Sequence, residues 1–302
     1  MADDPNWPRA SAWLAGDHLP DPVGTLAVLG APLHLGSITP GRCDLAPQAL
    51  RSALERYSTF DPDGGIDLRR LAVSDHGNAD VIDARPEEAF DALSGAIRSA
   101  RAAADVVAML GGDNSITRPG CLGIADPLER LGLLTLDAHH DLRDLDDGLS
   151  NGNPVRALLA DGLPGENIVQ LGIARFANSP AYAQVARDAG ITVGTVDAVR
   201  AQGIEASTRK ALEYLSDRAD RIYVDFDIDV LDRASAPGAP GSRPGGLTAA
   251  ELFTAARLCG AHPKVMAIDI VEVDPAIDVS DLTVLAAARC LLSFASGVVA
   301  RS

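Results

Sequence analysis

The chain has 302 residues, and its 42 aspartates and glutamates against 26 lysines and arginines give a formal net charge of −16. This acidic balance argues against nucleic acid and against an anionic membrane as main partners, because a phosphate-binding surface needs clustered lysine and arginine. With 47% apolar and 23% charged residues, the composition is that of a globular protein and not of a disordered one.

The sequence shows no targeting segment and no membrane span. Its first 17 residues have no basic stretch followed by an apolar run, and no window of 18 uninterrupted apolar residues occurs. The four cysteines lie far apart and form no C-x-x-C pair, which argues against a structural zinc site and favours a reducing compartment. We therefore expect a cytoplasmic protein with no membrane partner.

Short apolar runs alternate with longer helical patterns along nearly the whole chain. In chain order, strands are expected at residues 25–29, 106–110, 133–136, 168–171, 191–193, 222–226 and 265–270. Helices are expected at residues 47–57, 86–104, 180–189, 204–216, 249–258 and 281–295, and Thr248 with Glu251 forms a capping box before the fifth. Most strand runs lack alternating polarity, which indicates strands covered on both faces. This pattern predicts one α/β domain, residues 1–302, with a mainly parallel sheet.

Polar clusters follow three of the expected strands, at residues 111–115, 137–141 and 225–232. Alternate side chains of an extended chain share a face, so each of the last two clusters can point several acidic groups in one direction. The side chains concerned are Asp137, His139 and Asp141, and then Asp225, Asp227 and Asp229. Because ligands of open α/β sheets bind at the carboxyl ends of strands, we expect these groups to share one site.

Such an acidic cluster would repel itself unless cations neutralised it. Carboxylates with one or two imidazoles suit Mn²⁺, with Zn²⁺, Fe²⁺, Co²⁺ and Ni²⁺ as alternatives. Two divalent ions on four carboxylates would bring the local charge to zero, and such a pair lowers the pKa of a bridging water. The alternative interpretation is that both clusters only cap strand ends by accepting hydrogen bonds from loop amides.

Four segments carry a recognisable pattern: Gly111 to Ser115 (GGDNS), Asp137 to Asp141 (DAHHD), Asp225 to Arg233, and Val271-Glu272. They resemble the G-G-D-H-S, D-A-H-x-D, S-x-D-x-D-x-x-D-P and V-E signatures of the ureohydrolase superfamily, which includes arginases, agmatinases and formiminoglutamases. Asp225 stands where the family has serine, and Arg233 where it has proline. The resemblance extends from about Gly30 to the C-terminus.

The resemblance implies a three-layer α/β/α fold and a homo-oligomer, a trimer or hexamer. It also implies one or two Mn²⁺ ions per chain, with Asp137, His139, Asp141, Asp227 and Asp229 as metal ligands. Glu272 matches the family glutamate that pairs with the guanidinium or amidinium of the substrate, a task that a bidentate carboxylate fits well. The alternative for Glu272 is a strand-end acid that accepts hydrogen bonds from loop amides.

Two departures from the family pattern concern the metal centre. Asn114 replaces the first histidine ligand, and Asn151 replaces a histidine of an H-G segment. An amide oxygen can coordinate a hard cation but is a weaker donor than imidazole, so one ion should bind less tightly. Asn151 cannot exchange protons near neutral pH, so the leaving group must be protonated through water, Asp141 or another group.

Arg143, just after Asp141, is similar to the arginine of the D-A-H-F-D-L-R segment of formiminoglutamases. An arginine at the pocket rim can bind a substrate carboxylate. The alternative is a surface ion pair with Asp144, Asp146 or Asp147. We also expect Asn153, in the segment that follows Asp141, to contact the substrate.

The expected function is metal-dependent hydrolysis of a C–N bond in a guanidino or formimino small molecule. A metal-bound hydroxide would attack the trigonal carbon, with Asp141, Glu272 and Asn151 as the catalytic residues. Formiminoglutamate is the first expected substrate, and agmatine or another guanidino compound comes next. The alternative is a catalytically degenerate binding or regulatory protein with an incomplete metal centre. A nucleotide-binding protein is disfavoured because the sequence has neither G-x-G-x-x-G nor a phosphate-loop lysine motif.

Overall fold

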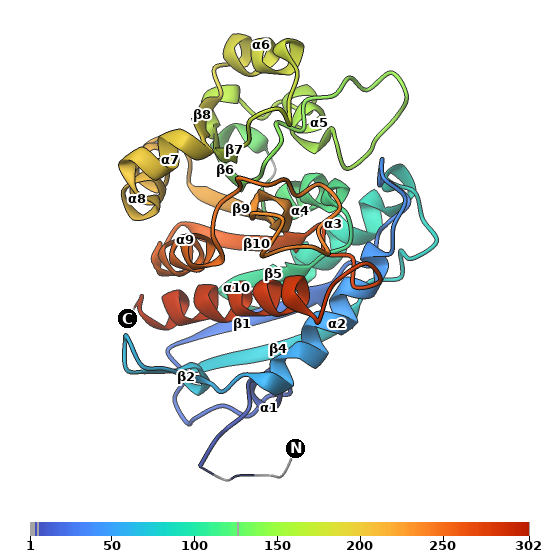
Figure 1. Cartoon of the computed structure of the whole chain (residues 1–302). Helices are drawn as coiled ribbons and strands as arrows, with labels where there is room; N and C mark the ends of the chain where they lie inside the picture. Colours follow the sequence, from blue (N-terminus) through green and yellow to red (C-terminus); the bar gives the residue numbers. More distant parts are fainter. Residues whose placement is uncertain (1–3, 5, 126, 302) are drawn as a thin grey trace.

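A parallel eight-stranded sheet lies at the centre of the computed structural model, which describes residues 4, 6–125 and 127–301 (Figure 1). In spatial order the strands are β4 (Leu71–Asn78), β1 (Gly24–Gly30), β5 (Val106–Leu110), β10 (Val265–Val271), β9 (Arg221–Asp227), β6 (Leu131–Leu136), β7 (Ile168–Ile173) and β8 (Thr192–Thr195). A small antiparallel pair, β2 (Phe60–Asp61) and β3 (Ile66–Asp67), lies apart from this sheet.

Helices cover both faces of the sheet. One face packs against α1 (Ala10–Leu14), α2 (Ala46–Ala53), α7 (Val196–Gln202), α8 (Ile204–Ser216), α9 (Ala249–Ala261) and α10 (Leu282–Val299). The other face packs against α3 (Pro86–Ala103), α4 (Thr117–Ile124), α5 (Pro154–Ala160) and α6 (Pro180–Ala189). The three-layer α/β/α fold with a parallel sheet is therefore confirmed.

Burial on both faces explains the strand sequences. Along β1, Leu26 and Val28 belong to one apolar core, whereas Ala27 and Leu29 belong to the other. Every residue of β5 and of β6 is buried. A strand that must be apolar on both faces cannot alternate in polarity, which is the pattern observed in the sequence.

Helix α10 is long and apolar enough to cross a membrane by length and composition alone. However, 83% of this stretch is buried inside the fold, and it packs mainly against α9 and α2 (Figure 1). An apolar helix surrounded by other elements is a core helix, and α10 has that position here.

The seven expected strands are present, and the capping box of Thr248 and Glu251 begins α9 as expected. The apolar pattern of the sequence did not predict β4. This edge strand is exposed along most of its length and contains Asp75 and His76 in place of an apolar run. The sequence also missed α4, whose segment contains a proline and two glycines. There Pro119 occupies the first turn, which tolerates it, and a side chain at Gly120 would overlap the hydroxyl of Tyr223.

The order β5-β10-β9-β6 places four polar strand ends side by side at the centre of the sheet. Gly112, just after β5, lies against the backbone of the loop after β1, because a Cβ there would be 1.8 Å from the carbonyl oxygen of Leu33. The glycines of the GGDNS segment thus let that loop approach the site closely.

Candidate metal centre and substrate pocket

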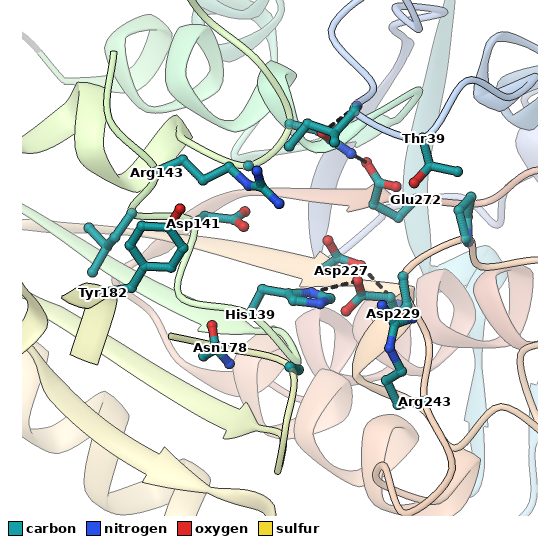
Figure 2. A pocket seen from close by; sticks show the side chains of 17 residues that line it. Thr39, His139, Asp141, Arg143, Asn178, Tyr182, Asp227, Asp229, Arg243 and Glu272 are labelled. Carbon is teal, nitrogen blue, oxygen red and sulfur yellow. Dashed lines mark hydrogen bonds and ion pairs between the residues drawn. The ribbon is translucent and has the colours of Figure 1, made fainter. Parts of the chain in front are cut away.

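A pocket opens above the carboxyl ends of these central strands (Figure 2). Five of the predicted functional acids and imidazoles line it: His139, Asp141, Asp227, Asp229 and Glu272. They come from the end of β9 and from the segments after β6, β9 and β10, which lie far apart in sequence. The structure therefore brings the separate motifs of the sequence into one site.

At the base of the site, ligand atoms of Asp137, His139 and Asp229 all lie within 4.8 Å of one another. The Nδ1 atom of His139 is 2.9 Å from Asp229 Oδ2 and 3.5 Å from Asp137 Oδ1. The charge of Asp229 is the main reason that the pKa of His139 rises to about 12. Burial, reinforced by Asp229, raises the pKa of Asp137 to about 6.

Asp141 and Asp227 are buried beside this trio. Burial is the main cause that raises the pKa of each carboxyl well above its usual range, and the neighbouring Asp137 and Asp229 add to it. Asp141 also has a left-handed backbone, with φ of 53°. Such a conformation is uncommon for a non-glycine residue and concentrates at functional sites.

Glu272 follows β10 and also has a left-handed backbone, with φ of 59°. Its Oε1 accepts hydrogen bonds from the backbone N–H of Asn114 at 2.8 Å and from Asn151 Nδ2 at 3.0 Å. Burial and the nearby Asp113 raise the pKa of Glu272 to about 8. Both recorded bonds go to one oxygen, so within the described residues Oε2 is left for a ligand in the pocket.

The three predicted asparagines have different surroundings. Asn114 is buried, and its Nδ2 donates to Asp141 Oδ2 at 2.5 Å. Asn151 lines the pocket and bridges Glu272 to the backbone N–H of Ile38. Its amide therefore holds two segments of the pocket wall together.

Asn153 does not line the pocket, contrary to the expectation that it contacts substrate. Its side chain is buried, donates to the carbonyls of Asp144 and Gly148, and accepts from the N–H of Ser150. All its polar atoms thus hold the loop after Asp141. We therefore assign Asn153 a structural role in this loop.

The rim of the pocket carries two arginines, Arg143 and Arg243, with Tyr182, Asn178 and Thr39 (Figure 2). Among the described residues, no ion pair joins Arg143 to Asp144, Asp146 or Asp147, and its side chain passes directly over Gly152. By contrast, Arg118 pairs with Asp161 at 2.6 Å. Arg143 thus offers an exposed cationic group at the pocket.

A family profile described as arginase family matches residues 25–296. The chain belongs to the arginase family. Formimidoylglutamase from Halalkalibacterium halodurans is 37% identical over 289 residues, which cover 93% of this chain and 89% of that protein. The crystal structure of formimidoylglutamase from Bacillus subtilis has a TM-score of 0.92 at 32% identity and covers 99% of this chain and 94% of that chain. A crystal structure of Trypanosoma cruzi formiminoglutamase with Mn²⁺ has a TM-score of 0.88 at 24% identity. The match covers 98% of this chain and 100% of that chain, and it shows that the two proteins have a similar fold.

The donor set of this arginase-family site fits a divalent cation. Asp137 Oδ2 is buried and has no hydrogen-bond partner among the described residues, an arrangement that costs free energy unless a cation or proton satisfies the oxygen. The imidazole of His139 lies between Asp137 and Asp229, and its raised pKa favours a positive charge there in metal-free protein. Buried oxygens around one imidazole are the ligand chemistry of Mn²⁺ and related ions.

Sequence reasoning missed Arg243, Tyr182 and Asn178, which the structure places at the pocket. Arg243 belongs to the loop between Asp229 and α9, and the others lie in or before α6. None is part of a motif, and only the fold shows that these segments reach the pocket. The proline- and glycine-rich composition of residues 234–246 was the one available signal for Arg243.

Proposed function

We propose that this arginase-family chain is a metal-dependent hydrolase that cleaves the C–N bond of a formimino compound bearing carboxylates, with formiminoglutamate as the first candidate. The observation that carries the proposal is the pairing of opposite charges in one pocket. Glu272 lies beside the acidic cluster, whereas Arg143 and Arg243 lie at the rim (Figure 2). A substrate with a cationic nitrogen end and an anionic tail matches that arrangement.

Asp137, His139, Asp141, Asp227 and Asp229 would hold the metal. When bound, divalent ions neutralise these carboxylates and make a water molecule more acidic. The similar formiminoglutamase from Trypanosoma cruzi was crystallised with Mn²⁺, which supports Mn²⁺ as the first metal to test. Asn114 borders this set through Asp141.

Glu272 would orient the formimino group. Its free Oε2 can accept N–H hydrogen bonds from the cationic amidine, while the bonds from Asn114 and Asn151 fix the carboxylate. Asp141, buried and already bonded to Asn114, would accept a proton from the attacking water and return it to the leaving nitrogen. Asn151 lacks a titratable proton and acts only by positioning Glu272.

The two arginines favour acids over amines. Each can bind a carboxylate, and two positive charges at the rim disfavour a second amine such as that of agmatine. A formimino dicarboxylate gains from both arginines, whereas a guanidino monocarboxylate engages one. Formimidoylglutamases among the similar proteins agree with this order.

The test is turnover by Mn²⁺-loaded protein of formiminoglutamate, guanidinobutyrate, agmatine and arginine, measured side by side. We expect formiminoglutamate to be preferred and Arg143→Met to raise its KM about tenfold or more, the loss of about one charged hydrogen bond. Arg130→Met is the matched control, because Arg130 forms an exposed pair with Asp220 away from the pocket. Turnover of none of the four would support the degenerate binding protein, and preference for agmatine would refute the proposed role of the arginines.

A further inference from the structure

A buried polar network lies behind Asn114, on the side away from Asp141. Thr117 Oγ1 is 2.6 Å from Asn114 Oδ1 and 2.8 Å from Asp269 Oδ2. The hydroxyl of Tyr223 donates to the same Asp269 oxygen at 2.8 Å. Thr117, Asp269 and Tyr223 are fully buried and come from α4, β10 and β9, respectively.

With Asp269 ionised, this network has fewer hydrogen-bond donors than it has close oxygen–oxygen contacts. Thr117 has one hydroxyl proton, yet two acceptor oxygens lie within hydrogen-bond distance of it. Asp269 is a carboxylate that can only accept from Thr117 when ionised. Donation to Asn114 therefore leaves the Asp269 contact without a proton, and donation to Asp269 leaves two oxygens facing each other at Asn114.

A half-turn of the Asn114 amide resolves this conflict. Its NH₂ group then donates to Thr117, and Thr117 donates to Asp269, so that every contact has one proton. The amide oxygen then faces Asp141 Oδ2, whose present contact with the amide is 2.5 Å. Two oxygens so close need either a proton on Asp141 between them or a cation beside them.

The network thus has two arrangements. Without a cation, the amide NH₂ donates to Asp141 and Thr117 donates to Asn114, which leaves the contact between Thr117 and Asp269 without a proton. With a cation beside Asp141, the amide oxygen turns toward it and Thr117 donates to Asp269. Hydrogen bonding at the NH₂ end also polarises the amide and strengthens its oxygen as a donor.

We propose that Thr117, held by Asp269 and Tyr223, is a positioning residue that turns the amide oxygen of Asn114 toward the more weakly bound metal ion. This inference rests on the metal-dependence of the proposed function. It explains how the chain uses a neutral amide at this position: the oxygen is oriented and polarised by buried groups on three elements. Gly120 leaves the space that the Tyr223 hydroxyl needs in order to reach Asp269.

The test measures Mn²⁺ binding without substrate, by isothermal titration and by metal content after dialysis. Thr117→Val keeps the shape of the side chain and removes the hydroxyl, and we expect at least a tenfold loss of affinity for the weaker ion, as for other groups that orient metal ligands. Thr117→Ser should stay within about threefold of the wild type, since the hydroxyl is retained. Thr208→Val is the matched control, because Thr208 is buried in α8 and its hydroxyl has no hydrogen-bond partner in the part of the chain that the structure describes.

Tyr223→Phe tests the same network from another strand and should weaken the same ion. Wild-type affinity for both ions in Thr117→Val and Tyr223→Phe overturns the inference, and so does an equal loss in Thr117→Ser and Thr117→Val. A wild-type protein that binds two ions but hydrolyses none of the four substrates would refute the proposed function alone. An unaffected Thr117→Val protein in an active enzyme would refute this inference alone.

Discussion

Gly241→Ala should disturb the candidate metal centre by a steric clash. A Cβ atom at position 241 would lie 1.9 Å from Asp229 Oδ2 and 3.1 Å from His139 Cε1. Non-bonded heavy atoms pack at about 3.5 Å, so the methyl group and the carboxylate must separate by about 1.5 Å. A binding constellation must be held to within about 0.5 Å. The substitution therefore has to move either the loop or a proposed ligand.

We expect Gly241→Ala to lower Mn²⁺ affinity by about 10- to 100-fold and the free energy of unfolding by about 1–3 kcal/mol. Isothermal titration of metal-free protein measures the first quantity and denaturant unfolding the second. Gly95→Ala is the control, because a Cβ there meets nothing within 4 Å and alanine favours the helix α3. Mn²⁺ binding by Gly241→Ala within twofold of the wild type would refute the steric reasoning.

Three further predictions concern pH, substrate binding and packing. In metal-free protein the pKa values of Asp137 (about 6) and Glu272 (about 8) are raised, so the folded state holds their protons more tightly than the unfolded state does. The free energy of unfolding should therefore fall as pH rises from about 4 to 8. The raised pKa of His139 acts in the same direction above about pH 6.5. Since Mn²⁺ favours the anionic carboxylates, its increase of Tm should be larger at pH 8.5 than at pH 5.5; an equal increase at both would contradict this account. Glu272→Gln should lower kcat/KM for formiminoglutamate at least about 30-fold by removing a buried charged partner, and a change below threefold would argue that Glu272 does not bind the substrate. Gly112→Ala should destabilise the fold by about 2 kcal/mol or more, because its Cβ would lie 1.8 Å from Leu33 O; unchanged denaturant unfolding would show that the loop after β1 yields easily.

The central strands could be predicted because their requirements are local. Strands such as β5 and β6 are buried on both faces, so each appears in the sequence as an uninterrupted run of five or six mostly apolar residues. The edge strand β4 has no such demand, since its carboxyl-terminal half is exposed. Its formation depends on pairing with β1, which a single sequence does not display.

The candidate site could be predicted where residues act through their own type and spacing. Asp137, His139 and Asp229 come together because two strand ends are neighbours of the same sheet edge. The contact of Asn153 with substrate stays a prediction, and the structure places its amide in hydrogen bonds to the preceding loop, which the sequence alone does not display. Arg243 could not be predicted, because its place at the pocket follows from the path of a long loop.

The contact of His139 with Asp229 also bears on how the candidate site would take up metal. In metal-free protein the raised pKa of His139 favours an imidazolium, which brings a positive charge of the chain's own to the acidic pocket. Metal acquisition then becomes a competition in which an incoming cation must displace a proton.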